Sequence, residues 1–127
     1  MGADLCTPIE AGEEAGSRLR VTKGQTAALE RSIDTLNARL GALTSFVLPG
    51  GSGPAAALHL ARTRTGRAER ATVALAQVEA DGTNPETVGY LNRLSDLLFV
   101  MARAANRDGA DDVLWAPGKS QGKKGDE

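Results

Sequence analysis

The sequence predicts an all-α fold, with three long helices of an up-down helical bundle. Aromatic residues make up only 3% of the 127 residues, so alanine and leucine must fill the core, which favours helices over sheets. Apolar residues also recur at helical spacing in separate segments, each preceded by helix-start residues. A chain of this length indicates one domain, which we place at residues 1–116.

The first long helix should follow a connector. Residues 1–20 are acidic and contain glycine, and we interpret them as a connector after the end of a helix. Thr22 stands three residues before Gln25, the spacing of a capping box. The helix then carries an apolar seam at alternating four- and three-residue steps: Leu29, Ile33, Leu36, Leu40 and Leu43. We expect this helix to end between Gly41 and Thr44.

The second helix should run from about Pro54 to Ala80. Proline suits the first turn of a helix, and Ser52 or Gly53 just before it can serve as the cap. The pair Asp81-Gly82 should close the helix.

The third helix should begin at Asn84-Pro85-Glu86, which provides a cap, a first-turn proline and an acid at the positive end of the helix dipole. Its apolar seam comprises Leu91, Leu94, Leu98, Met101 and Ala105. Gly109 is the expected C-terminal stop. The polar stretch at 117–127 predicts a disordered tail.

Composition and charge exclude several classes of protein. Lys and Arg number 15 against 16 Asp and Glu, a net charge of −1, which indicates neither nucleic acid nor an anionic membrane surface as the main partner. Cys6 is the only cysteine, so one chain can build neither a disulfide nor a cysteine metal site. We find no signal-peptide pattern and no apolar run of about 18 residues, so we expect no membrane span and a cytoplasmic setting.

The second helix places its cations on one face. That face comprises His59, Arg62, Thr63, Gly66 and Arg70, and a packing face of Ala57, Ala61, Ala68 and Leu75 should lie roughly opposite. Arginine suits phosphate because its planar fork donates two parallel hydrogen bonds. The alternative is a solvated basic face paired with Glu69 and Glu79. Because surface charge runs are common, the residues alone favour that alternative.

The third helix carries a polar stripe: Asn92, Ser95, Asp96, Phe99 and Arg103. The stripe indicates either an interhelical hydrogen-bond network or an amide and a carboxylate that face a ligand, and both remain open.

The loop FVLPGGSG lacks the ending of a Walker phosphate loop, so it is either a tight turn or an element that sets Phe46 against a flat ligand. The lone His59 indicates packing, and we predict no metal site.

Three motifs, taken in their order along the chain, resemble a known protein family. FVLPGG, HLARTxxxRAER and YLNRLSDLLFVMAR closely resemble the PduO-type ATP:cob(I)alamin adenosyltransferases, and so do GADLCTP and ALERSIDTLNARL. The resemblance implies the C-terminal part of a five-helix bundle that assembles as a trimer. It implies transfer of the 5′-deoxyadenosyl group of ATP to the cobalt of a reduced corrinoid, cob(I)alamin or cob(I)yrinic acid a,c-diamide, with release of triphosphate.

The resemblance also implies roles for particular residues. ATP, as its Mg²⁺ complex, should contact four residues: Arg62, Glu69, Arg70 and Asn92. Phe46 matches the phenylalanine that packs beneath the corrin and excludes a lower ligand, and Asp96 belongs to the matching NRLSD motif at the corrinoid site. No side chain is assigned a catalytic role, because cobalt(I) is itself the nucleophile.

Two departures from the family pattern matter. The family's N-terminal portion, with its Thr/Gly/Asp-rich ATP loop, is not in this sequence, so we expect a bundle truncated at its N-terminus. Gly66 stands where the family has an arginine that contacts the ATP phosphates. The alternative function is therefore a non-catalytic remnant, a helical module that binds corrinoid or other subunits.

Overall fold

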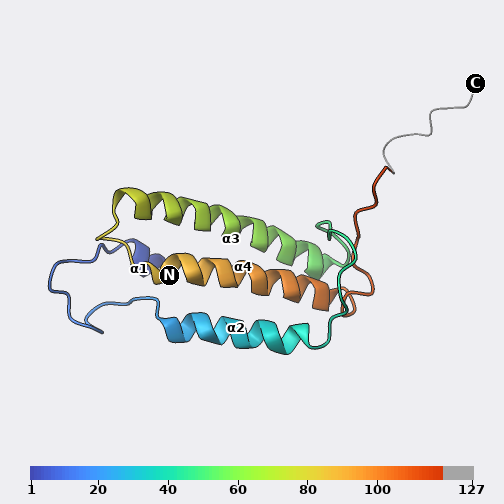
Figure 1. Ribbon diagram of the computed structural model, residues 1–127, viewed down its shortest axis with the longest axis horizontal. Helices are drawn as coiled ribbons and strands as arrows, with labels where there is room; N and C mark the ends of the chain where they lie inside the picture. Colours follow the sequence, from blue (N-terminus) through green and yellow to red (C-terminus); the bar gives the residue numbers. More distant parts are fainter. Residues whose placement is uncertain (119–127) are drawn as a thin grey trace, which may run out of the picture.

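The computed structural model describes residues 1–118 and shows three long helices in a row (Figure 1). The elements are α1 (Gly2–Leu5), α2 (Lys23–Asn37), α3 (Gly53–Val78) and α4 (Glu86–Ala105). Helix α4 packs against both α2 and α3, which lie on either side of it. Helices α2 and α4 run in the same direction and α3 runs opposite to both. The predicted all-α fold is confirmed.

Little of the described chain is extended. Within residues 1–118 the only β-type pairing is an isolated antiparallel bridge between Val47 and Leu114. Of the tail predicted to be disordered, residues 119–127 lie outside the described residues, while 117–118 form a turn. Nowhere in residues 1–118 is a helix both long and apolar enough to cross a bilayer.

The start of α2 follows the prediction and its end does not. The Thr22 hydroxyl accepts a hydrogen bond from the Gln25 N–H, and the Gln25 side chain accepts one from the Thr22 N–H, so the capping box is confirmed. The helix ends at Asn37, before the predicted Gly41 to Thr44 and before the last two residues of the seam. After the helix ends, Arg103 of α4 donates a 2.9 Å hydrogen bond to the carbonyl of Gly41, which holds the chain away from the helical path.

The starts of α3 and α4 lie close to those expected, whereas both helices end early: α3 at Val78 before the predicted Ala80, and α4 at Ala105 before the predicted stop at Gly109. The Ser52 hydroxyl accepts a hydrogen bond from the Ala55 N–H and Pro54 lies in the first turn of α3, as predicted. At the start of α4 the structural N-cap is Pro85, while the Asn84 side chain accepts from the Glu86 N–H at 3.1 Å. Asn84 therefore caps the turn from one residue further out than a standard N-cap.

The packing face predicted for α3 is correct only in part, since Ala61 and Leu75 are half-buried. Ala57 and Ala68 are exposed, whereas Ala55, His59 and Thr72 are buried. The His59 ring contacts Phe99 of α4 edge-on. The face that carries the cationic residues is thus also the face that meets α4. An alanine-rich helix is apolar on several sides, so its composition does not fix which side packs.

The predicted seam of α4 is correct in part. Leu91 is buried and Leu94 and Leu98 are half-buried, whereas Met101 is exposed. The fully buried residues of α4 are Thr87, Leu91, Val100, Ala102 and Arg103. Because α4 has a neighbour on each side, its buried surface is wider than a single seam.

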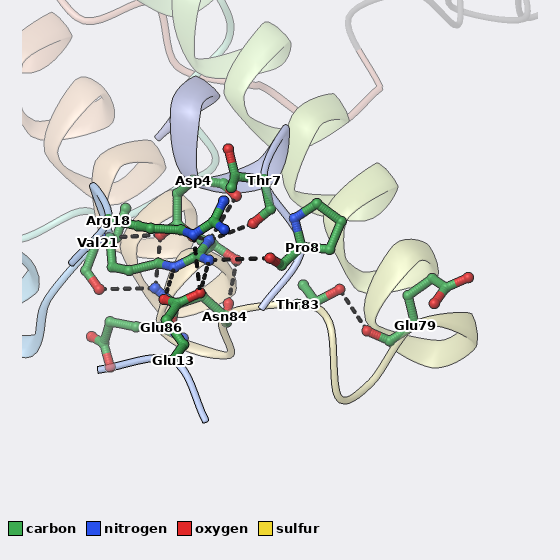
Figure 2. Close-up of polar contacts among 12 residues, drawn as sticks. Asp4, Thr7, Pro8, Glu13, Arg18, Val21, Glu79, Thr83, Asn84 and Glu86 are labelled. Atoms are coloured by element: carbon green, nitrogen blue, oxygen red, sulfur yellow. Dashed lines mark hydrogen bonds and ion pairs between the residues drawn. The ribbon is translucent and has the colours of Figure 1, made fainter. Parts of the chain in front are cut away.

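Residues 1–20 are more than the connector we predicted, because Asp4 of α1 is the centre of a buried polar network (Figure 2). Its carboxylate accepts hydrogen bonds from the Val21 N–H at 2.6 Å, the Asn84 amide at 2.7 Å and Arg20 at 2.9 Å. Arg20 also pairs with Glu13 at 2.7 Å. The network joins the N-terminal segment to the turn between α3 and α4.

The Asp4 network has a testable pH dependence. Burial acts to raise the pKa of Asp4, but the hydrogen bonds from Val21, Asn84 and Arg20, with the charge of Arg20, outweigh it and hold the pKa below its ordinary value of 3.8. A carboxylate of this kind stabilises the fold above its unfolded pKa, and the contribution is lost as pH falls through the lowered folded-state pKa.

Asp4→Asn should therefore lower the free energy of unfolding by about 1.5–3 kcal/mol at neutral pH, since it weakens hydrogen bonds to a charged group. Urea denaturation should show that the difference in free energy of unfolding between this variant and the unchanged protein disappears between about pH 5 and about pH 2. Asp34→Asn, at an exposed position on α2, is the control and should change little at either pH. A gap that does not depend on pH would contradict this account of Asp4.

Candidate functional site

A polar hollow of about 420 Å³ lies where α3 meets α4. The lining residues are Arg62, Thr63, Gly66, Glu69 and Arg70 from α3 and Ser95 from α4. The structure thus brings together three of the predicted nucleotide-binding residues. The fourth, Asn92, borders them, because its amide donates a 3.1 Å hydrogen bond to the Glu69 carboxylate.

The arginines of α3 carry charge that the protein does not neutralise. Within residues 1–118, none of Arg62, Arg64, Arg67 and Arg70 makes an ion pair. The alternative of a solvated basic face is borne out in part: the four side chains are exposed, but Glu69 and Glu79 pair with none of them in the described chain. Arg62 and Arg70 line the hollow, whereas Arg64 and Arg67 do not. The hollow is suited to a polyanion.

An aromatic ring supports Arg62. The guanidinium carbon lies 4.8 Å from the centroid of the Phe99 ring, a cation–π geometry. His59 contacts the same ring edge-on, with centroids 6.4 Å apart. His59 is 2% exposed and neither ring nitrogen has a hydrogen-bond partner. Burial, together with the nearby charge of Arg62, lowers the pKa of His59, so the imidazole is neutral and packs.

Nothing in the described part of the chain gathers metal ligands. Residues 1–118 contain no group of three or more His, Cys, Asp or Glu side chains placed to hold an ion.

Asp96 does not join the hollow. It is exposed and pairs with Arg93 at 3.1 Å, and Arg93 in turn pairs with Glu30 of α2 at 3.0 Å. The polar stripe predicted on the third helix is therefore divided. Asn92 and Phe99 meet α3, Asp96 lies toward α2, and Arg103 is a buried partner of Asp112.

Phe46 lies in a second, more apolar hollow. Its side chain is 78% exposed, in the loop between α2 and α3. The hollow measures about 680 Å³ and is lined by two segments, 43–46 and 115–117. Phe46 does not line the α3–α4 hollow, so the two predicted ligand sites are separate surfaces within this chain.

Comparison with known proteins identifies the family. Residues 1–105 match the cobalamin adenosyltransferase family. The chain belongs to this family.

Relatives of this adenosyltransferase-family chain agree with the fold and share much of its sequence. A corrinoid adenosyltransferase of Mycobacterium tuberculosis H37Rv is 50% identical over 117 residues, which is 92% of this chain and 59% of that protein. The human corrinoid adenosyltransferase is 38% identical over 117 residues, 91% of this chain and 46% of that one. The chain therefore spans well under two thirds of the length of these relatives.

A solved structure of the family matches closely. It is a phenylalanine-to-histidine variant of the PduO-type ATP:corrinoid adenosyltransferase of Lactobacillus reuteri, complexed with cobalamin and ATP. The TM-score is 0.78 at 39% identity, over 91% of this chain and 61% of that chain. An arginine-to-lysine variant of the L. reuteri protein, complexed with ATP, matches with the same TM-score of 0.78.

In this member of the cobalamin adenosyltransferase family, Asn106 positions the glycine turn before α3. Asn106 is buried at the end of α4, where its side chain accepts from the Ser52 N–H at 2.9 Å and donates to the Gly50 carbonyl at 3.1 Å. Gly51 has φ +98, and a Cβ there would lie 2.3 Å from the Asn106 oxygen. Glycine is required at position 51 because Asn106 occupies the space of a side chain.

Sequence reasoning missed several residues that build the site. The segment at 113–115 pairs with the Phe46 loop, where the Leu48 N–H donates to the Val113 carbonyl at 2.7 Å and the Trp115 N–H to the Phe46 carbonyl at 2.8 Å. Asp112, buried between Arg103 and Asn106, anchors this segment. The short apolar run Val113–Leu114–Trp115 is the available signal, but it is too brief to predict pairing with a loop some 70 residues away.

Proposed function

We propose that the chain forms the nucleotide- and corrinoid-binding part of an ATP:corrinoid adenosyltransferase. The triphosphate of ATP lies in the α3–α4 hollow, and the corrin ring packs against Phe46. The observation that carries the proposal is the pair of arginines, Arg62 and Arg70, that line one hollow without an ion-pair partner in the described chain. A triphosphate supplies the negative charge that these cationic side chains lack as a partner.

The reaction requires orientation and charge neutralisation rather than proton transfer. Cobalt(I) attacks the 5′-carbon of ATP, and its electron pair forms the Co–C bond. The bond from the 5′-carbon to oxygen breaks, and triphosphate leaves with the electron pair of that C–O bond. Arg62 and Arg70 stabilise the charge on the leaving group, and the hydrogen bond to Asn92 orients Glu69 at the wall of the hollow.

The corrinoid is held by apolar contact. Phe46 is an exposed ring on a loop fixed at both ends, so it can occupy the face of the corrin opposite the adenosyl group. In that position it excludes a lower ligand from cobalt, which favours the cobalt(I) state. Because the corrin face is common to cob(I)alamin and cob(I)yrinic acid a,c-diamide, both are proposed substrates. Asp96 is proposed to bind the corrinoid because of its place in the NRLSD motif, and in this chain its carboxylate pairs with Arg93.

We further propose that residues 1–116 act as one helical unit of a trimer in the cytoplasm, where ATP is abundant. The separation of the two hollows within one chain supports association, because transfer requires both substrates at one place. Exposed apolar side chains on α3, Leu60 at 58% and Val78 at 77%, also support it. The Mg²⁺ ion would arrive bound to the triphosphate.

The alternative function is a non-catalytic module that keeps corrinoid or subunit contacts. Gly66 favours it, since glycine contributes no donor at the centre of the hollow. Chemical turnover separates the two functions, because the module would bind corrinoid without forming a Co–C bond.

Arg70→Ala tests the proposal. With cob(I)alamin and MgATP, its rate of Co–C bond formation, followed by absorbance, should fall about 10- to 150-fold, the loss of a charge-assisted contact worth about 1.5–3 kcal/mol. Arg67→Ala is the matched control, because Arg67 is on the same helix and outside the hollow, and it should stay within about twofold. Equal losses in both variants would reject the hollow as the triphosphate site. Corrinoid binding without any Co–C bond in the unchanged chain would favour the module.

A further inference from the structure

The Phe46 ring is exposed, although packing against a flat ligand requires that it keep one orientation. The aromatic contact it makes in the described chain is with Trp115. The two rings meet edge-to-face, with centroids 6.2 Å apart and planes at 67°. An exposed ring with no such neighbour would exchange between rotamers, so this contact restricts the orientation of Phe46.

The backbone holds Trp115 in register with Phe46. The Trp115 N–H donates to the Phe46 carbonyl at 2.8 Å, and the Ser45 hydroxyl donates to the Trp115 carbonyl at 2.6 Å. These bonds join residues that lie 69 and 70 positions apart in the chain. The two aromatic residues therefore move as one unit.

The segment that carries Trp115 is fixed to α4. Asp112, three residues before Trp115, pairs with Arg103 at 2.8 Å, and both side chains are buried. Asp112 also accepts a 3.3 Å hydrogen bond from Asn106, the residue that holds the glycine turn. The loop of Phe46 and the segment of Trp115 are thus positioned from the same end of α4, and both line the 680 Å³ hollow.

We propose that Trp115 is a positioning residue of the corrinoid site. It holds the Phe46 ring against the flat apolar face of the macrocycle and forms the second aromatic wall of the hollow. The inference rests on the proposed function, since it concerns the corrinoid that the function requires. A purely structural Trp115 would only join the segment to the loop, and its replacement would alter stability but not the state of bound cobalt.

The chain offers a direct probe, because Trp115 is its only tryptophan. The corrin ring absorbs where tryptophan emits, so cob(II)alamin bound in this hollow should quench the fluorescence of the unchanged chain in a saturable way. Phe46→Leu should change the emission of Trp115 before any ligand is added, since it removes the edge-to-face contact.

The decisive variants are Trp115→Ala, Trp115→Phe and Leu114→Ala, with cob(II)alamin as the probe in the presence of MgATP. Trp115→Ala should weaken binding about three- to tenfold, as expected for loss of an aromatic pair, while Trp115→Phe keeps an aromatic edge and should stay within about threefold. Electron paramagnetic resonance should show a smaller share of cobalt(II) without a lower ligand in Trp115→Ala alone. Leu114→Ala, in the same segment but outside the hollow, should match the unchanged chain.

The outcomes separate this inference from the proposed function. If the unchanged chain binds cob(II)alamin and Trp115→Ala gives the same affinity and the same resonance spectrum, the positioning role is rejected and the proposed function stands. If the unchanged chain shows neither quenching nor a cobalt spectrum altered by the protein, both are rejected. Circular dichroism melting of each variant checks that any loss is measured on folded protein.

Discussion

Gly66→Arg should bind MgATP about 10- to 150-fold more tightly than the unchanged chain, because a charge-assisted hydrogen bond to phosphate is worth about 1.5–3 kcal/mol. The new side chain has room, since a Cβ at position 66 meets only an Arg70 nitrogen, at 3.5 Å. Repulsion from Arg62 and Arg70, each four residues away, costs about 0.2–0.5 kcal/mol per pair and is outweighed. Calorimetric titration measures the change.

Two control variants isolate the cause of the expected gain. Gly66→Ala adds the Cβ without charge and should alter affinity little. Ala68→Arg adds the same charge at an exposed position that does not line the hollow, and it should give a small, salt-sensitive gain. If Ala68→Arg matched Gly66→Arg, the gain would be a general charge effect, and the hollow would lose its support as the triphosphate site.

Gly51→Ala should lower the free energy of unfolding by about 2–5 kcal/mol, the sum of a left-handed backbone for a non-glycine residue and an overpacked contact. The added methyl would lie 2.3 Å from the Asn106 oxygen, so Asn106 must move and give up its hydrogen bonds to Ser52 and Gly50. A loss of that size is a large fraction of the stability of a typical domain, about 5–15 kcal/mol. Urea denaturation monitored by circular dichroism measures it.

Gly53→Ala is the matched control for Gly51→Ala. Gly53 lies two residues later, has no positive φ, and a Cβ there would have nothing within 4 Å. Its replacement should change stability by less than about 0.5 kcal/mol. Equal effects at the two positions would show that Asn106 does not dictate the residue at position 51.

Local signals in the sequence predicted the helices well. The capping box of Thr22 and Gln25 and the Ser52–Pro54 start of α3 involve residues a few positions apart, so they can be recognised without tertiary structure. The end of α2 could not be recognised in this way. It coincides with the bond from Arg103 to the Gly41 carbonyl, which joins positions 62 residues apart.

In the candidate site, too, local relations between residues could be predicted from the sequence and long-range contacts could not. Arg62, Glu69 and Arg70 share a face because of helical spacing, and the structure places them together. Asp4 and Asn84 are 80 residues apart, and their contact depends on how the N-terminal segment returns to the turn before α4. Trp115 lies 69 positions from Phe46, and no periodic pattern in the sequence links the two residues.

The order of the helices in space has a consequence for how the chain folds. Helices α3 and α4 are joined by a short turn and pack against each other. Helix α2 also packs against α4, but the whole of α3 lies between α2 and α4 in the sequence. Closing a long loop costs more entropy than closing a short one, so the α3–α4 hairpin can form early and α2 docks onto it afterwards. Both walls of the α3–α4 hollow belong to that hairpin, so this hollow can form before the rest of the molecule is complete.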